Sequence, residues 1–521
     1  MRRSETDHPL LYEINTRVWL REQARSKTRK APSLANVPDR VLDELAGLGF
    51  DLVWLMGVWQ SGETAVREAR RHPGLQGEYR QTLPDLKPED IIGSPYAIQD
   101  YQVSRQLGGR AALAQLRRRL GRRNVGLILD FVPNHTARDH RWVFSHPEFY
   151  VSATEELLQQ EPQNYFAIET VRGRRILAHG RDPYFPGWSD TAQLDYRQPA
   201  LRAAMIETLL EIAGQCDGVR CDMAMLVLQD VFARTWGETA QPLDAPAAEG
   251  DFWAEAMDAV RGRYPEFLFM AEAYWGLEGE LQALGFDYTY DKTLYDRLVH
   301  PGAAAVCDHL RGDSELQGRA VRFLENHDEL RAAQVFPPDK HRAAALICYA
   351  APGMRFFHEG QLEGRQVRVP VQLARRPAEP LDRELHAFYR KLLAELSHPA
   401  LRRGRWKLLE ASPAWEGNCT SEQFVIQRWD AGGRGSRLAV ANFGPQQAQC
   451  YVRLDLTHIR GRQVVLRDLL SDAVYERDGN TLLQPGLYLD MAPYHVHLFQ
   501  LSPTPGLEGP QQSKRGRGPK P

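Results

Sequence analysis

Residues 125–135 read Val-Gly-Leu-Ile-Leu-Asp-Phe-Val-Pro-Asn-His, an apolar run that ends in polar side chains. Three later segments repeat this design, with Gly-Val-Arg-Cys-Asp at 218–222, Ala-Glu-Ala at 271–273 and Glu-Asn-His-Asp at 325–328. An uninterrupted apolar run of this length is typical of a strand that is buried on both faces of a parallel sheet. The four segments therefore predict parallel strands whose carboxyl ends bear acids, histidines and one arginine.

Apolar runs of strand length alternate with segments of helical periodicity down to about residue 404. The expected strands are Leu11–Trp19, Leu52–Met56, Val125–Phe131, Gly218–Cys221, Phe267–Ala271, Phe286–Tyr290, Ala320–Leu324 and Met354–Phe357. Between them, a helix that opens at Pro199 carries its leucines and methionine on one face. This alternation predicts the α/β class and a (β/α)8 TIM barrel, whose functional residues lie at the carboxyl ends of the strands.

The chain divides into four expected regions. Residues 1–135 and 199–404 form the barrel, and residues 136–198, which are rich in aromatic, Pro and His residues, form a small inserted domain after the third strand. Residues 405–502 have the short alternating strands and turns of an antiparallel β-sandwich. Residues 503–521 are rich in Pro, Gly and basic residues and are expected to be a disordered tail.

Composition excludes several classes of partner. The net charge is 65 − 67 = −2, so no overall field recruits nucleic acid or an anionic membrane. The amino terminus is polar, and no apolar run approaches the ~18 residues of a spanning helix. Six scattered cysteines without metal-type spacing are expected to be buried free thiols. These features predict a cytoplasmic protein with no nucleic-acid or membrane partner.

The acids at the strand ends differ in their expected ionisation. Arg220 and Asp222 are two residues apart on one strand, so both side chains face the same way, and the guanidinium should lower the pKa of Asp222. Glu272 follows an apolar strand, and apolar surroundings raise the pKa of a carboxyl. An ionised and a protonated carboxyl are the pair that a nucleophile and a general acid require. The alternatives are a structural Arg–Asp pair and an exposed loop glutamate.

Two further pairs combine a histidine with an aspartate. They are His327 with Asp328, and His135 with Asp130. Such pairs can bind hydroxyl groups, although each alone is more often a structural hydrogen bond. A barrel metalloenzyme built on them is a weaker interpretation, because no HxxxH or CxxC spacing accompanies them.

Taken together, the ordered segments resemble the motifs of the α-amylase family, glycoside hydrolase family 13. The resemblance covers nearly the whole chain, to about residue 502. It implies that Asp222 is the nucleophile, Glu272 the general acid/base and Asp328 the stabiliser of the transition state. The residues it implies for binding of the sugar at subsite −1 are Arg220, His135, His327, Tyr96 and Asp130.

The resemblance implies a retaining α-glycosidase that acts on α-glucosidic oligosaccharides or glucans by double displacement. No cofactor is required for this chemistry. The alternative is a transglycosidase of the same family, of the glucanotransferase or sugar-isomerase type, because the first half-reaction is the same. A non-catalytic barrel that serves as a binding subunit is more remote, since all three carboxylates are present.

The chain departs from the family pattern on the leaving-group side. Many members have a Lys-His pair at the third and fourth positions after the nucleophile, where this chain has Met225 and Leu226. The inserted segment brings Tyr184, Phe185 and Trp188, which are expected to narrow the approach and to stack on sugar rings. We therefore expect a preference for short α-glucosides over starch, unless other loops replace the missing contacts.

Other positions leave alternatives open. Gly93 stands where some chain-end-cutting members carry an aspartate. His358 and Glu359 either contribute to the pocket or form structural hydrogen bonds. Many family members hold a structural calcium, whose ligands here would be Asn134 and Asp195; the alternative is that these two residues brace loops, since calcium prefers about six to eight oxygens.

Overall fold

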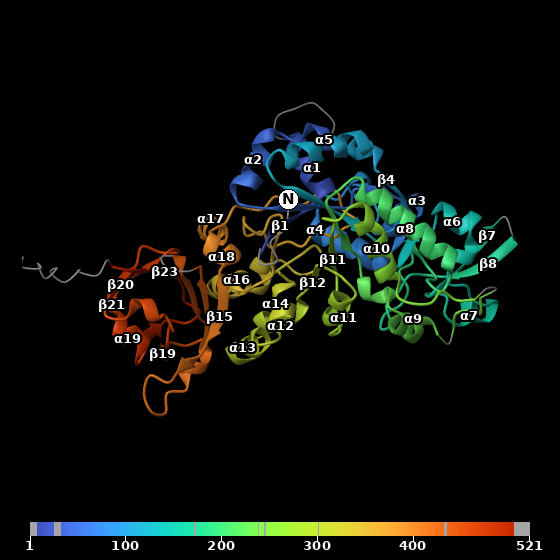
Figure 1. Ribbon diagram of the computed structural model, residues 1–521. Coiled ribbons are helices and arrows are strands. Elements are labelled where there is room, and N and C mark those ends of the chain that lie inside the picture. The colour runs from blue at the N-terminus through green and yellow to red at the C-terminus, as the bar shows by residue number, and fades with distance from the viewer. Residues whose placement is uncertain are drawn as a thin grey trace, which may run out of the picture.

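The computed structural model describes residues 8–25, 33–170, 173–237, 239–243, 246–300, 302–431 and 435–504 (Figure 1). Eight parallel strands close into a barrel in the order β1-β14-β13-β12-β11-β10-β5-β2. Their bounds are β1 Leu10–Asn15, β2 Leu52–Met56, β5 Gly126–Phe131, β10 Gly218–Cys221, β11 Leu268–Ala271, β12 Tyr288–Tyr290, β13 Ala320–Arg322 and β14 Met354–His358. The predicted TIM barrel is confirmed, and each strand expected before residue 404 corresponds to one of the eight barrel strands.

The first expected strand, Leu11–Trp19, is longer than the strand in the structure. It was extended to Trp19, but β1 ends at Asn15 and helix α1 (Thr16–Arg25) begins at the next residue. The side chain of Asn15 accepts a hydrogen bond from the Val18 amide (3.3 Å), as a capping residue does. Val18 and Trp19 are nonetheless buried, so the apolar run continues through both elements and hides the boundary.

Helices surround the barrel and bury its outer face. They include α2 (Asp39–Gly47), α5 (Gly109–Gly121), α8 (Pro199–Ala213), α10 (Phe252–Arg263), α12 (Lys292–Val299), α16 (Pro338–Ala350) and α17 (Arg383–Leu396). The main core lies between these helices and the strands. A second core fills the barrel interior and includes Trp54, Ile128, Met270 and Phe356. The two layers fix the strand ends that carry the polar residues.

Two excursions leave the barrel at its carboxyl end. The inserted segment after β5 contains the paired strands β6 (His135–Ala137) and β9 (Thr191–Gln193), and the hairpin of β7 (Tyr165–Thr170) and β8 (Gly173–Ala178). The connection after β2, which the sequence did not single out, contains β3 (Trp59–Ser61), α3 (Glu63–Arg71), α4 (Pro73–Thr82) and β4 (Ile98–Val103).

The carboxyl-terminal region is a separate antiparallel unit with its own apolar core. Its six-stranded sheet has the order β15-β17-β18-β23-β20-β21, with bounds Arg405–Leu409, Phe424–Asp430, Arg437–Asn442, Val496–Pro503, Gln463–Asp468 and Val474–Asp478. A three-stranded sheet joins β16 (Ala411–Ser412), β19 (Ala448–Val452) and β22 (Leu487–Met491). Figure 1 shows this unit on the left and the inserted segment on the right of the barrel. Residues 505–521 of the expected tail lie outside the described residues.

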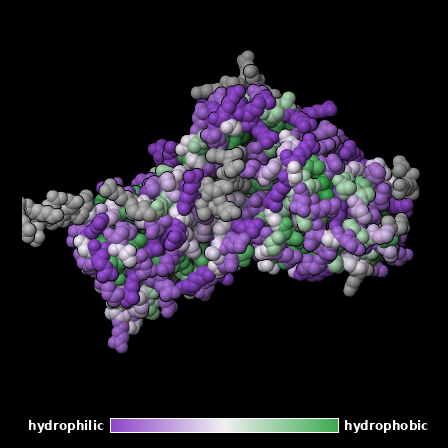
Figure 2. Space-filling model, in the orientation of Figure 1, coloured by the Kyte–Doolittle hydropathy of each residue, from purple (hydrophilic) through white to green (hydrophobic). Residues whose placement is uncertain are grey.

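Within the described residues, no helix combines the length and the apolar character that a membrane crossing needs. Figure 2 shows a largely hydrophilic face with scattered apolar residues. The six cysteines are all free: Cys216, Cys221, Cys348 and Cys450 are buried, Cys307 is half-buried and Cys419 is exposed. The expectation of buried thiols therefore fails for Cys419 and is met only in part for Cys307.

Candidate active site

The three acids of the sequence motifs lie at the carboxyl ends of β10, β11 and β13. Asp222 and Glu272 each follow the last residue of their strand directly, and Asp328 is reached through the short loop after β13. The residue after Asp222, Met223, has a positive φ of 42°, which turns the chain away from the strand direction at this point. The parallel strands thus present the three side chains at one end of the barrel, as β/α barrels do.

Arg220 is the centre of the arrangement. It is fully buried, and its guanidinium forms a close ion pair with Asp222 and a second one with Glu272 (Nη2 to Oε2, 2.7 Å). The guanidinium carbon lies 5.2 Å from the ring centroids of both Trp54 and Tyr96. The expected Arg220–Asp222 contact is confirmed, and the same arginine also joins the two acids from adjacent strands.

Glu272 has the surroundings of a proton donor. It is buried, and its carboxylate accepts hydrogen bonds from the Met223 amide (2.7 Å) and the Tyr274 hydroxyl (2.8 Å). Burial raises the pKa of Glu272 to about 7; the Arg220 guanidinium opposes the shift and the Asp222 charge adds to it. A carboxyl with this pKa holds its proton over part of the neutral range, as general acid catalysis requires.

The expected direction of the Asp222 pKa was wrong. Burial raises the pKa of this carboxyl, and the charge and hydrogen bond of Arg220 offset the rise without reversing it. The sequence reveals the arginine two residues away but not how completely both side chains are removed from water. The close contact with Arg220 still stabilises the ionised form of Asp222. A carboxyl that was buried as deeply but had no such partner would ionise less readily.

His327 connects Asp328 to the buried residue Glu13 of β1. Its Nε2 lies 3.0 Å from Asp328 and 2.8 Å from the Tyr96 hydroxyl, and its Nδ1 lies 2.5 Å from Glu13. Burial alone would lower the pKa of His327, but the carboxylates of Asp328 and Glu13 raise it well above its usual value. The side chain of Asp328 is 51% exposed, and the partial loss of water around it is outweighed by the His327 imidazolium and by Arg220, which bring the pKa of Asp328 to about 2. Asp328 is therefore a carboxylate throughout the neutral range.

Tyr96 contacts His327, and His135 lies against the inserted segment. The Tyr96 ring stacks on His327 with centroids 5.4 Å apart. His135 is buried, and its ring lies 5.1 Å from that of Trp188, which the inserted segment contributes. Burial lowers the pKa of His135 to about 4, so this imidazole is neutral and can both donate and accept a hydrogen bond.

Asp130 lies beneath the site rather than in it. Its two carboxylate oxygens accept hydrogen bonds from Trp54 Nε1 (3.0 Å) and from the Gly57 amide (2.8 Å), and the residue is only 1% exposed. Burial raises the pKa of Asp130 to about 6. Because both oxygens are engaged inside the protein, we assign Asp130 to holding the end of β2 in place, and not to direct contact with a ligand.

Two residues of the site, Glu13 and Tyr274, were not predicted from the sequence. Glu13 is a fully buried acid on β1 that contacts His327, and Tyr274 contacts Glu272. The signal for Glu13 was a single carboxylate inside the apolar strand Leu-Leu-Tyr-Glu-Ile. An ionisable group in such a strand needs a buried partner, so its position predicts a polar contact inside the barrel.

His358 and Glu359 belong to an internal polar network. His358 Nδ1 lies 3.2 Å from Glu325, which also pairs with Arg331 at 2.6 Å. Glu359 forms a close ion pair with Arg376. These contacts favour the structural interpretation of His358 and Glu359 over a place in the pocket.

The proposed calcium ligands are occupied by protein donors. Arg197 binds both carboxylate oxygens of Asp195, at 2.8 and 2.7 Å. The Asn134 side-chain oxygen accepts a hydrogen bond from Gln193 Nε2 at 2.9 Å. In the described part of the chain, no group of three or more His, Cys, Asp or Glu residues is placed to hold a metal. The donor set does not fit calcium, and the two residues brace loops instead.

The residues expected on the leaving-group side differ in their exposure, because Met225 and Leu226 are buried whereas Tyr184 is exposed. Met225 and Leu226 lie in the short 3-10 helix Ala224–Val227 and are buried in the main core. Exposed aromatic side chains lie instead at Tyr184 and Trp275, whose ring centroids are 5.1 Å apart. Trp275 is three residues after Glu272, so this pair places an apolar surface beside the acid.

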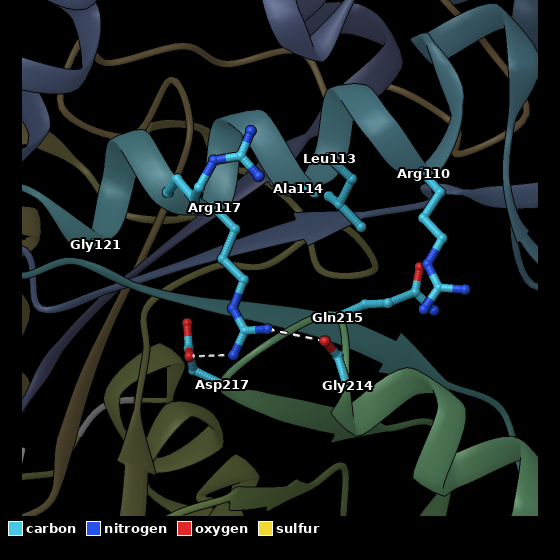
Figure 3. Close-up of a pocket in the computed structure, with 9 residues that line it drawn as sticks. Arg110, Leu113, Ala114, Arg117, Gly121, Gly214, Gln215 and Asp217 are labelled. Carbon is cyan, nitrogen blue, oxygen red and sulfur yellow. Dashed lines mark hydrogen bonds and ion pairs between the residues drawn. The ribbon is translucent and has the colours of Figure 1, made fainter.

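A separate hollow lies at the other end of the barrel. A cavity of about 490 Å³ opens between α5 and the segment after α8, next to the amino-terminal ends of β5 and β10 (Figure 3). Arg117 crosses it to pair with Asp217 (2.7 Å) and to donate to the Gly214 carbonyl (3.1 Å). Conserved chemistry of barrel enzymes sits at the opposite end, so we do not assign this cavity to the site.

Known proteins resemble this chain in sequence and in fold. An α-amylase MalA of Haloarcula japonica is 25% identical over 374 residues, which are 69% of this chain and 44% of that relative. The chain spans about half the length of the curated relatives it matches. Similar solved structures include a maltogenic α-amylase AmyB from Thermotoga neapolitana (TM-score 0.66, 19% identity, 95% of this chain and 99% of that one) and an α-amylase from Lactobacillus plantarum (0.62, 23%, 95% and 98%).

These structures share the fold, while the family is given by sequence. The family model for the α-amylase catalytic domain matches residues 22–368, which include all four motif segments and every strand of the barrel from β2 to β14. The chain therefore belongs to the α-amylase family, glycoside hydrolase family 13.

Proposed function

We propose that the protein is a retaining α-glycosidase that acts on α-glucosidic oligosaccharides or glucans. The observation that carries the proposal is the joint contact of Arg220 with Asp222 and Glu272. It holds two buried carboxyls with different hydrogen-bond partners on adjacent strand ends. Paired carboxyls with separate roles are what double displacement at a glycosidic bond requires.

In the first step, an Asp222 oxygen attacks the anomeric carbon while the bond from that carbon to the glycosidic oxygen breaks. Glu272 gives its proton to the departing oxygen, and a covalent glycosyl-enzyme remains. In the second step, the Glu272 carboxylate takes a proton from water, whose oxygen attacks the same carbon and releases Asp222. Asp328, ionised beside His327, stabilises the positive charge that develops on the sugar ring.

The polar residues around the acids suit a sugar ring at subsite −1. The Tyr96 ring offers an apolar face for stacking, and the neutral His135 can bind a hydroxyl group. His327 already spends both ring nitrogens on protein partners, so we assign it mainly to orienting Asp328. A sugar hydroxyl as acceptor in place of water would give transglycosylation as a side reaction.

We propose that short α-glucosides are better substrates than starch. Met225 and Leu226 are buried and apolar, so they offer no hydrogen bonds to a second leaving-group sugar. Tyr184 and Trp275 supply a stacking surface for roughly one further ring instead. Values of kcat/KM for maltose, maltoheptaose and soluble starch test this. A steep rise with chain length that continues to starch would contradict it.

A cytoplasmic location is part of the proposal. Six free cysteines, four of them buried, suit a reducing compartment better than an oxidising one. Fractionation of the source cells with an antibody against the protein tests this location.

The activity itself is tested with a panel of pure sugars. Maltooligosaccharides, sucrose, trehalose and isomaltose are each incubated with the wild-type protein and with Asp222→Asn, and the products are separated by chromatography over time. We expect cleavage of at least one α-glucoside by the wild type and none by the variant. Equal product formation by both proteins would contradict the assignment of Asp222.

A further inference from the structure

Two long connections meet over one strand of the barrel. Residues 57–97 follow β2 and residues 359–382 follow β14. In the barrel, β1 is the strand between β2 and β14, so the two connections approach each other above β1. The sequence gives no sign of this meeting, because the connections are separated by most of the chain.

The two connections are joined through their backbones. The Ile92 amide donates to the Gln372 carbonyl (2.9 Å), and the Ala374 amide donates to the Asp90 carbonyl (2.9 Å). Ile91 and Leu373 form an antiparallel bridge between these hydrogen bonds. We call residues 78–92 and 368–375 together the seam. Reciprocal backbone bonds of this kind fix two segments at a single register.

Charged and apolar contacts strengthen the seam. Arg375 pairs with Asp85 (2.9 Å) and with Asp90 (2.8 Å), and Arg21 of α1 pairs with Asp90 at 3.0 Å. Leu373 is fully buried in a small apolar cluster with residues of α4 and of the segment that follows it. The contact with α1, which begins directly after β1, agrees with a position above that strand. The seam is thus held by backbone hydrogen bonds, ion pairs and apolar packing together.

The inner edge of the seam adjoins the site. Arg368 forms a close ion pair with Glu78 of α4, and its Nη1 also reaches the backbone carbonyl of Asp328 at 3.4 Å. About one third of each side chain of the pair remains exposed (32% and 35%). The pair therefore forms a surface that a bound sugar next to Asp328 would meet.

The position of the acid shows which side of the site the seam occupies. Glu272 protonates the leaving group, so the leaving group lies toward β11. Around the eight-stranded barrel, β11 is four strands from β1 in either direction. The seam above β1 therefore stands across the barrel mouth from Glu272, on the side toward which the sugar chain would continue away from the leaving group.

We infer that the seam closes the glycone side of the site, so that the enzyme attacks α-glucan chains only at their non-reducing ends. This inference rests on the proposed glycosidase function. A chain that continued past the sugar at Asp328 would have to occupy the space of the Glu78–Arg368 pair and of the backbone bonds behind it. The open leaving-group side, bordered by Tyr184 and Trp275, still admits the remainder of the chain.

The test compares two forms of one substrate. p-Nitrophenyl α-maltoheptaoside is used with a free non-reducing end and with that end blocked by a 4,6-O-ethylidene group, and all products are separated by chromatography. We expect the wild type to cleave the free form at least 100-fold faster than the blocked form. Comparable rates on both would overturn the inference while leaving the glycosidase function intact. Cleavage of neither form would overturn the inference that the enzyme attacks α-glucan chains, and it would contradict the proposed function only if no sugar of the panel is cleaved either.

The double variant Glu78→Ala/Arg368→Ala tests the pair itself. Removing both side chains opens the inner edge, and we expect the ratio of the two rates to fall at least tenfold toward one. The thermal midpoint should change little, because partly exposed ion pairs contribute little stability. Arg342→Ala, which removes a surface pair with Glu384 on the barrel exterior at 3.0 Å, is the control and should leave the ratio unchanged. An unchanged ratio in the folded double variant would overturn the assignment to this pair.

Discussion

Replacing Glu272 with glutamine should make the stability of the protein less dependent on pH. Glu272 is 3% exposed, and its pKa lies at about 7 in place of the ordinary 4.5. Between these two values the folded chain holds a proton on this carboxyl that the unfolded chain has lost. Since the folded state binds more protons there, the free energy of unfolding decreases as the pH rises from 4.5 to 7. Glutamine does not ionise, so the variant lacks this decrease.

The size of the effect follows from the two pKa values. The interval from 4.5 to about 7 corresponds to about 3 kcal/mol, at roughly 1.4 kcal/mol per pKa unit. For a chain of 521 residues the entropy of unfolding is about 1.1 kcal/mol/K, so the shift in the midpoint is about 3 °C. We expect Glu272→Gln and the wild type to unfold at the same temperature at pH 4.5, and the variant to unfold about 3 °C higher at pH 8.

Differential scanning calorimetry of both proteins at pH 4.5, 6 and 8 measures this directly. Glu384→Gln is the control, because the Glu384 side chain is 86% exposed and should give no difference that grows with pH. A difference between Glu272→Gln and the wild type that is the same at all three pH values would refute the reasoning. It would mean that Glu272 is not held with a raised pKa in the folded protein.

Other predictions concern the residues around the acids. Glu13→Gln should lower kcat roughly 10- to 100-fold, because it removes the charged partner of His327, worth about 1.5–3 kcal/mol; an unchanged kcat would exclude this positioning role. Asp130→Asn should lower the thermal midpoint and leave KM unchanged, since its oxygens bind only protein donors; a higher KM at an unchanged midpoint would place it in contact with substrate. A chelator should not change the midpoint, because Arg197 occupies both oxygens of Asp195; a calcium-reversible drop that Asp195→Asn abolishes would argue otherwise.

The sequence was sufficient for the barrel because its strands are continuous apolar runs. Each such run before residue 404 forms a strand of the barrel. The polar residues at the carboxyl ends of β10 and β11 contact each other, as expected for adjacent parallel strands. The boundaries were less accessible. Between β1 and α1 the apolar pattern does not change, and only the side chain of Asn15 marks the start of the helix.

The parts of the site that could not be predicted depend on contacts between distant segments. Glu13 and His327 are 314 residues apart in sequence, and Glu78 and Arg368 are 290 apart. Neither pairing follows from local spacing. The predicted direction of the Asp222 pKa shift was wrong for a related reason. A nearby arginine can be recognised in the sequence, but the depth of burial of Asp222 depends on the whole fold.

The central claim is that Asp222 forms a covalent bond to the sugar. The most direct measurement uses 5-fluoro-α-D-glucosyl fluoride, whose fluorine substituent slows breakdown of the glycosyl-enzyme, followed by proteolysis and mass spectrometry of the labelled protein. The account predicts that one fluoroglucosyl unit is attached to the peptide that contains Asp222, and to Asp222 itself on fragmentation. A label on another residue, or an unlabelled protein that releases the β anomer from an α-glucoside substrate, would contradict it.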